Sequence, residues 1–404
     1  MLGVISWRNV WRNKGRTLVV MLATTLGVAA ISFAISFMRT FVVNYVDNAI
    51  DDQYSHIQIA YPDFRTNQDI HLSIAGGEKI AASIRDTPGV HGVTARTALT
   101  GMVSSAKSSG GAQIFGVVPQ DDADVFGVKE AIIEGEYFNG IKSNPALIGK
   151  DMAEKFNAGV KSKIVLTFTD KQNNVVYGAF RVAGIFDSSS PALDQSAVIV
   201  QKTDLERLVG EDELTHIIAV RLEDQEKLQE IASALSARYP DLNVDTWKDL
   251  APELELVISQ SMTSLYIVMA IILLALAFGI VNTMLMAVLE RVKELGMLMA
   301  VGMNKTRIFL MVMLETIIVT TIGGPLGFLL GFSIISYFNR YGLDMSNYSR
   351  GLEDWGFDAI MYPDLDFYYY VIIAVGIVIT AVLAAIYPAI KAIKLKPAEA
   401  LHKI

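Results

Sequence analysis

The residue types that could do chemistry are limited, because the 404-residue chain contains no cysteine. That absence excludes disulfides, thiolate nucleophiles and cysteine-ligated zinc or iron–sulfur centres. The five histidines are scattered, and the acidic run Asp121, Asp122, Asp124 lacks the spaced ligands of a calcium loop, so we expect solvated side chains there. The phosphate-binding loop, the H-E-x-x-H zinc motif and the G-x-S-x-G nucleophile motif are all missing. We therefore predict no catalytic, cofactor-binding or metal-binding residue in this chain.

One ionisable residue, Glu315, lies inside a long apolar run, where a charge is a functional candidate by default. A proton- or ion-coupled carrier would need a chain of Asp, Glu, His or Lys residues, which the apolar runs lack. Glu315 also lies near one end of its run. We favour a carboxylate that is paired with Arg16 or Arg291, or hydrated at the interface, over a transport site.

Three glycines, Gly323, Gly327 and Gly331, recur every four residues in the same run. Small residues at this spacing let two helix backbones approach closely. Alternatively, they accommodate Gly324 and Pro325, because proline interrupts helical hydrogen bonding. Both explanations stay open, and the three glycines and Glu315 are our helix-packing candidates.

Four apolar runs are long enough to cross a bilayer, since about 20 residues rising ~1.5 Å each span a ~30 Å hydrocarbon core. The first and its stalk cover 17–41, the second and its stalk 256–289, and the others 308–339 and 367–390. The second run exceeds the membrane thickness, so we expect its first turns to stand outside as a stalk.

Charge sets the expected orientation of these spans. Bases outnumber acids in 1–16, 290–307 and 391–404, whereas acids outnumber bases in 42–255 and 340–366. Basic loops stay in the cytoplasm, so both termini are predicted to be cytoplasmic and the two acidic segments external. The formal net charge of −8 argues against nucleic-acid binding.

The external segment 42–255 alternates strand and helix patterns. Its two ends, 42–111 and 206–255, carry similar strand–helix–strand units that we expect to pair in one subdomain, with 112–205 as an inserted second one. The expected strands are 56–60, 90–103, 113–118, 164–169, 178–186, 197–200, 217–222 and 243–246, and the expected helices are 77–85 and 224–238. The predicted fold is an α-helical membrane protein with four transmembrane helices and a large α/β extracytoplasmic domain between the first two.

A motif follows the second span: E-R-x-K-E-L-G-x-L-x-A-x-G over 290–302, with a Glu and G-G-P-x-G in the next run. This pattern resembles the MacB/FtsX-type (type VII) ABC transporter permeases. The starting W-R-N-V-W-R-N-K at 7–14, the Y-P-A at 387–389 and the K-P-A-E-A-L at 396–401 are similar too. The resemblance covers nearly the whole chain, including the order of one span, an external domain and three spans.

The resemblance implies a complex in the bacterial inner membrane. A second permease, either another copy or a paralogue, would pair with this one, and a separate ABC ATPase dimer would hold ATP and Mg. The two parts of 42–255 would be a porter-like subdomain and a Sabre-like insert, and the stalks would transmit ATP-driven closure (mechanotransmission). The segment 290–307 would be the cytoplasmic coupling helix, with the ATPase-coupling residues Glu290, Arg291, Lys293, Glu294, Leu295, Gly296 and Gly302.

Within this superfamily the chain most resembles the lipoprotein-releasing LolC/LolE group. The features that carry this resemblance are the S-H-I-Q-I strand at 55–59 and the chain length. That group extracts acylated lipoproteins from the outer leaflet of the inner membrane, which implies an acyl-chain pocket between the first two spans. Ordinary lipid-facing or packing surface is the alternative. The pocket candidates are Phe33, Phe37, Met38, Phe41, Met262, Leu265, Tyr266 and Met269.

The hairpin that recruits a periplasmic carrier in LolC-type proteins corresponds here to a short turn at 169–178. A periplasmic carrier, a lipoprotein and membrane lipid thus stay open as partners. Two alternatives to lipoprotein release are a MacB-like exporter of peptides or drugs from the periplasm and an FtsX-like activator of a cell-wall hydrolase.

Overall fold

The structure is a computed structural model that describes residues 2–12, 14–346 and 360–394. The K-P-A-E-A-L motif at 396–401 lies outside these residues. The chain forms two compact units, a helical one and an α/β one. The helical unit contains residues up to 42, 258–346 and those from 360 onward, and the α/β unit is built mainly from 43–257.

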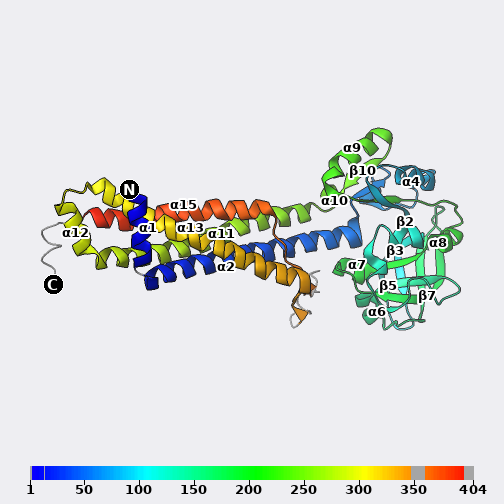
Figure 1. Cartoon of the computed structure of the whole chain (residues 1–404). Helices are drawn as coiled ribbons and strands as arrows, with labels where there is room; N and C mark the ends of the chain where they lie inside the picture. Colours follow the sequence, from blue (N-terminus) through cyan, green and yellow to red (C-terminus); the bar gives the residue numbers. More distant parts are fainter. Residues whose placement is uncertain (1, 13, 347–359, 395–404) are drawn as a thin grey trace. The chain divides into compact units, whose positions relative to one another are not determined.

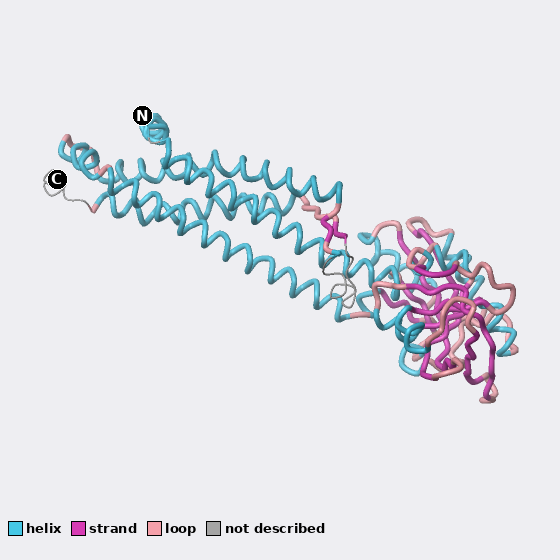
Figure 2. The backbone as a smooth tube through the Cα atoms, turned by 90° about the horizontal axis from the view of Figure 1, so that it is seen from below, coloured by secondary structure: helices cyan, strands magenta, loops and turns pink. Residues whose placement is uncertain are grey.

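The helical unit is a bundle of long helices that lie side by side (Figures 1 and 2). Its helices are α1 (Leu2–Arg12), α2 (Lys14–Ala49), α11 (Pro252–Glu290), α12 (Val292–Ala300), α13 (Lys305–Tyr341) and α15 (Phe367–Ile393). Four of them, α2, α11, α13 and α15, are long and apolar enough to cross a membrane. The prediction of four transmembrane helices is therefore confirmed, and α1 lies crosswise near one end of the bundle (Figure 1).

The contact between α13 and α2 depends on glycine. A Cβ atom added to Gly327 would lie 2.6 Å from Val28 Cβ and 2.7 Å from the carbonyl oxygen of Thr25. For Gly323 and Gly331 the nearest α2 atom would be 3.0 and 3.1 Å away. The Thr25 hydroxyl also donates to the Gly323 carbonyl at 3.1 Å. The glycine-lined face of α13 thus lies directly against the α2 backbone.

The α/β unit is built on a 10-stranded sheet. Its strand order is β10-β1-β9-β2-β3-β8-β5-β7-β4, and β6 pairs with both β2 and β7. The strands are β1 (Ile57–Ala60), β2 (Val90–Ser104), β3 (Ser109–Val117), β4 (Ile132–Gly135), β5 (Pro145–Gly149), β6 (Lys163–Thr169), β7 (Val175–Phe186), β8 (Ala197–Gln201), β9 (Ile217–Leu222) and β10 (Asn243–Thr246). A separate pair, β11 (Leu343–Asp344) and β12 (Ile360–Met361), belongs to the helical unit.

Short helices cover and connect this sheet (Figure 1). They are α3 (Phe64–Asn67), α4 (Gly77–Arg85), α5 (Pro119–Ala123), α6 (Lys150–Phe156), α7 (Pro191–Ser196), α8 (Lys202–Val209), α9 (Leu228–Arg238) and α10 (Trp247–Leu250). Single turns of other helix types are η1 (Ile50–Tyr54), η2 (Gly127–Lys129) and η3 (Gln225–Lys227), of which η1 is a π-helical turn that directly follows α2.

The long strand β2 belongs to both expected subdomains. Its first part pairs with β9, which comes from the C-terminal end of the domain, and its second part pairs with β3 and β6. The expected boundary at 111–112 falls inside β3. The two parts therefore share a continuous strand instead of meeting at a linker.

A buried ion pair fixes the α5 segment against β2. The Arg96 guanidinium binds the Asp122 carboxylate twice, at 2.6 and 2.9 Å, and its Cζ lies 3.3 Å from the centre of the Phe126 ring. Asp122 is only 1% exposed. The expectation that this acidic run is solvated was therefore wrong for Asp122, because bidentate pairing with arginine satisfies a buried carboxylate.

Three consecutive side chains of η1 are bound to other elements of the α/β unit. Asp51 accepts from the Arg221 guanidinium of β9 at 2.8 Å, and Asp52 accepts from the backbone N–H of Ser189 at 2.7 Å. Gln53 accepts from the Ser190 hydroxyl at 2.8 Å. The end of the first long helix is thus held by the sheet and by the loop before α7.

The close packing of α13 against α2 predicts the effect of adding a side chain to one of the three glycines. We expect Gly327→Ala to destabilise the bundle by about 1–3 kcal/mol, because its Cβ would clash with α2. Thermal unfolding of the detergent-solubilised chain would measure this. Gly324→Ala is the matched control on the same helix, since a Cβ there meets nothing within 4 Å. Equal unfolding temperatures for the two variants would contradict the packing argument.

A buried carboxylate predicts the pH dependence of the α/β unit. Burial raises the pKa of Asp194 to about 7 from its ordinary 3.8, although hydrogen bonds from Ser188 act in the opposite direction. The folded state therefore holds a proton that the unfolded state has released. The stability from protonated Asp194 is fully present below the unfolded pKa and is lost as the pH rises through about 7.

Asp194→Asn should remove this part of the pH dependence. We expect the unfolding temperature of the full chain to fall less between roughly pH 4 and 8 in the variant than in the wild type. Asp241→Asn, at an exposed turn, is the control and should keep the wild-type slope. Parallel pH profiles for the wild type and Asp194→Asn would refute the assignment.

Candidate functional site

The motif residues 290–302 form the end of α11, a break at Arg291, the short helix α12 and the turn after it. Within α12 the motif splits in two. Leu295 and Gly296 are buried, whereas Lys293 and Glu294 are exposed. Gly302 adopts a φ of +100° just after the helix, a conformation that favours glycine. The motif therefore both fastens α12 to the bundle and shapes its end.

A buried ion pair lies at the break between α11 and α12. Arg291 Nη1 donates to both carboxylate oxygens of Glu315, at 3.0 and 3.2 Å, and the two side chains are only 11% and 8% exposed. The side-chain amide of Asn9 donates to the same carboxylate at 2.7 Å. The sequence indicated Arg16 or Arg291 as a partner of Glu315. In the structure the partner is Arg291, and the side chain of Arg16 is not described. The carboxylate thus joins α1, the α11–α12 break and α13.

Further polar contacts tie α1 into the same region. Arg12 forms an ion pair with Glu294 of α12. The Ser6 hydroxyl, itself fully buried, donates to the carbonyl of Met311 in α13 at 3.2 Å. These contacts make α1, α12 and the start of α13 one connected assembly.

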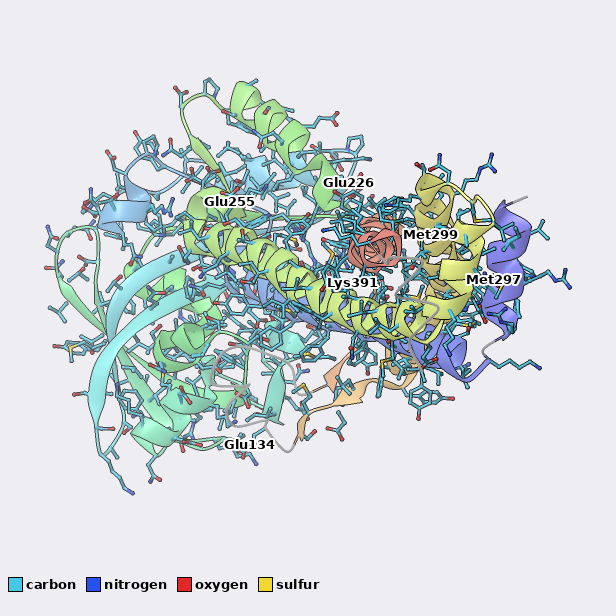
Figure 3. All side chains as sticks on the ribbon, turned by 90° about the vertical axis from the view of Figure 1, so that its left-hand side faces the viewer. Glu134, Glu226, Glu255, Met297, Met299 and Lys391 are labelled. Atoms are coloured by element: carbon cyan, nitrogen blue, oxygen red, sulfur yellow. The ribbon has the colours of Figure 1, made fainter. Side chains whose placement is uncertain are left out.

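The outward face of α12 exposes apolar side chains. Met297 is 57% exposed and Val301, four residues later, is 84% exposed. Figure 3 shows Met297 and Met299 on α12, near the end of α15 that carries Lys391. Residues four apart share one face of a helix, so Met297 and Val301 form an apolar ridge. The sequence motif did not identify these two residues as a site. Their spacing of four residues, on a helix whose Leu295 is buried, is the pattern that could have indicated an exposed apolar face.

The acyl-pocket candidates lie on α2 and α11. Five of them pack in or against one apolar cluster with Ile335 of α13 and Ile373 of α15: Phe33, Met38, Met262, Leu265 and Met269. The rings of Phe33, Phe37 and Phe41 follow one another along α2 at 6.5 and 6.3 Å between centroids. Tyr266, in contrast, is 47% exposed.

These candidates make contacts within the bundle. Leu265 is 4% exposed, and the Tyr369 hydroxyl of α15 donates to the Met262 sulfur at 3.5 Å. A cavity of about 280 Å³, which sequence reasoning did not find, lies between α13 and α15 beside Gly324, Pro325 and Phe328. The structure thus brings most of the candidates together as packed apolar surface.

Removal of one partner from the buried ion pair should be strongly destabilising. We expect Glu315→Gln to cost about 3–5 kcal/mol, because it leaves the Arg291 guanidinium buried without its counter-charge. The measurement is thermal unfolding of the solubilised chain. The double variant Arg291→Met, Glu315→Met should recover most of the loss, since it leaves no isolated charge. A double variant no more stable than Glu315→Gln would contradict this account.

Two family models match the chain. The MacB-like periplasmic core domain covers residues 17–238, more than half of the 404 residues, and the FtsX-like permease C-terminal model covers residues 266–397. An uncharacterised ABC transporter permease of Methanocaldococcus jannaschii is 31% identical over 207 residues, which are 50% of this chain and 50% of the relative. The chain therefore matches about half the length of that relative.

A second relative is the lipoprotein-releasing system transmembrane protein LolC of Xylella fastidiosa. It is 23% identical over 303 residues, which are 72% of this chain and 73% of LolC. Among solved structures, the periplasmic region of MacB from Actinobacillus actinomycetemcomitans is 15% identical, with a TM-score of 0.36, and covers 52% of this chain and 97% of that one.

The two family models divide the chain in much the same way as the structure does, into a part rich in sheet and a part made of long helices. The periplasmic-core model covers α2 and most of the sheet, and the permease model covers most of α11, α12, α13 and α15. The chain belongs to the MacB/FtsX family of ABC transporter permeases.

Proposed function

We propose that this chain is the permease subunit of an ATP-driven mechanotransmission transporter in the bacterial inner membrane. It extracts lipoproteins, or another lipidic substrate, from the outer leaflet. The observation that carries the proposal is the cluster of Phe and Met side chains contributed by α2 and α11. Methionine and aromatic side chains make adaptable apolar walls, which suit acyl chains of variable length. The similarity to LolC over 72% of the chain supports the same assignment.

The ridge of Met297 and Val301 on α12 is our candidate docking surface for a separate ABC ATPase dimer, which would bind ATP and Mg. In this proposal both termini and α12 face the cytoplasm, and 42–255 and 340–366 face outward. A second permease, another copy or a paralogue, completes the complex. The exposed motif residues Lys293 and Glu294 border the ridge and would contribute polar contacts.

The proposed transmission begins where α12 is fastened. An ATPase that moves α12 pulls on Arg291, and the Glu315 ion pair passes this movement to α13 and α1. The glycine contact passes it from α13 to α2, because backbones in direct contact cannot slide without repacking. Helix α2 is continuous to Ala49, where η1 is bound by the α/β unit.

A second candidate is MacB-like export of peptides or drugs from the periplasm. The match of the MacB-like periplasmic core model over residues 17–238 favours it. FtsX-like activation of a cell-wall hydrolase is a third, supported by the permease model over residues 266–397. The three functions differ in what the complex releases or retains.

Release of lipoprotein from reconstituted membranes tests the proposal. Proteoliposomes would contain the permease, its natively co-purified partners and a triacylated lipoprotein. We expect ATP to release the acylated protein into solution. Proteoliposomes supplied with a non-hydrolysable ATP analogue are the control. Release of a peptide or drug without lipoprotein, or co-purification of a hydrolase without release, would refute it.

The same assay tests the docking surface. We expect Met297→Asp to lower the amount of co-purified ATPase and the ATP-driven release at least tenfold, because a charge placed in an apolar contact loses more than about 1.4 kcal/mol of binding. The exposed Met102 of β2 provides the matched control, Met102→Asp, which should leave ATPase binding unchanged. Equal losses in both variants would show that α12 is not the docking site.

A further inference from the structure

The α/β unit contains a cavity of about 220 Å³ that the proposed function does not use. Its floor is one face of the sheet where β10, β1, β9, β2 and β3 run side by side. Side chains from these strands that line it include Gln58, Ala60, Ile217, Ala98 and Gln113. The floor therefore crosses from the porter-like part of the sheet into the Sabre-like part.

The walls come from short helical elements around this floor. The turn η1 supplies Gln53 and Tyr54, α3 supplies Phe64 and Arg65, and Gln68 directly follows α3. Arg65, Gln68 and Gln113 are exposed, so the cavity is open to solvent at this rim. The result is an open cavity with polar amides and aromatic rings around a flat floor.

Four of the eight polar side chains that line the cavity are glutamines. Among the residues that the structure describes, three of these glutamines use only one end of the amide. Gln53 Oε1 accepts from Ser190, and Gln68 Oε1 accepts from the Thr100 hydroxyl at 2.7 Å, so within the described part of the chain both retain an unpaired NH₂ donor. Gln58 Nε2 donates to the Tyr54 carbonyl at 2.8 Å, so it retains its carbonyl acceptor.

The fourth amide, that of Gln113, has no hydrogen-bond partner among the residues that the structure describes. It adds one donor group and one acceptor to the rim. The cavity therefore offers donors on two walls and acceptors on its floor.

The charges at the cavity largely cancel. The Arg96 guanidinium is already paired with Asp122, and Arg65 donates to the Leu250 carbonyl at 2.8 Å. Burial raises the pKa of Asp245 on the floor, although the nearby Arg65 acts in the opposite direction. Such surroundings do not select a strongly charged ligand. They suit a neutral ligand that has both donors and acceptors.

We propose that this cavity binds a short uncharged segment of polypeptide. A secondary amide has one acceptor and one donor, which match the free NH₂ groups of Gln53 and Gln68 and the free carbonyl of Gln58. An apolar side chain of the same segment would lie against Tyr54 and Phe115. The volume is below the ~300–1,000 Å³ of sites that enclose whole small molecules, so it suits part of a longer chain. The site goes beyond the proposed function, because that function rests on the apolar cluster of α2 and α11 and assigns no polypeptide-binding site to the α/β unit.

The ligand would contact both halves of the α/β unit. Gln53 and Tyr54 belong to η1, which follows α2, whereas Gln113 and Phe115 belong to β3. A bound segment would therefore bridge the end of the first long helix and the Sabre-like part. Binding and the position of η1 are linked, since each ligand contact to η1 depends on where that turn lies.

Equilibrium dialysis of the full chain in nanodiscs tests the proposal. The probe is the pentapeptide Gly-Ser-Leu-Ser-Gly with a radiolabelled N-acetyl group and a C-terminal amide, so it carries no charge. We expect saturable binding of one peptide per chain. The pair Gln58→Leu, Gln113→Leu should raise the Kd at least tenfold, since each lost hydrogen bond weakens binding about fivefold.

Two further variants keep the test decisive. Gln113→Leu alone changes an exposed side chain without an intramolecular hydrogen bond, so the fold does not depend on it; we expect a Kd about fivefold higher. Gln172→Leu, an exposed glutamine in the turn between β6 and β7, is the control and should bind as the wild type does. Unfolding temperatures of all variants are measured in parallel.

Three outcomes would overturn the proposal. One is the absence of saturable binding by the wild type. Another is a Kd that both the double variant and Gln113→Leu leave unchanged. The third is tighter binding of maltotriose than of the peptide at this cavity, which would identify a saccharide site. None of these depends on lipoprotein release, so the fate of the proposed function is decided separately.

Discussion

The buried pair of Arg291 and Glu315 is the interaction on which the membrane part of this permease depends. A carboxylate among apolar helices persists only when it is paired and hydrogen-bonded. Here the Glu315 carboxylate of α13 accepts hydrogen bonds from Arg291 at the α11–α12 break and from Asn9 of α1. Together with the Arg12–Glu294 ion pair and the buried Leu295, this polar junction fixes the position of α12 and the orientation of the apolar ridge of Met297 and Val301.

Direct backbone contact is the second constraint. Where Gly327 meets Thr25 and Val28, no side chain separates α13 from α2, so neither helix can shift there without repacking the other. The Phe and Met side chains lie farther along the same helices and can repack, because methionine is flexible. The bundle thus combines a close backbone contact with an adaptable apolar region.

The sequence predicted what has a strong local signal. Long apolar runs gave the four membrane helices, and alternation gave β9 and β10 at the observed bounds. The strand β5 was missed, because all five of its residues are buried and its sequence does not alternate. The pairing of Arg96 with Asp122 and the exposed ridge on α12 depend on contacts distant in sequence. The subdomain boundary expected at 111–112 falls inside β3, because strand pairing across β2 and β3 is not visible in the pattern.

The π-helical turn η1 has a mechanical consequence. Successive residues of a helical turn project in different directions around its axis, and Asp51, Asp52 and Gln53 are each bound to a different group. A helix end held at one point transmits only push and pull, because it can spin freely. An end held at three points around its circumference also transmits torque. Rotation of η1 about its own axis would therefore be resisted by both β9 and the loop before α7.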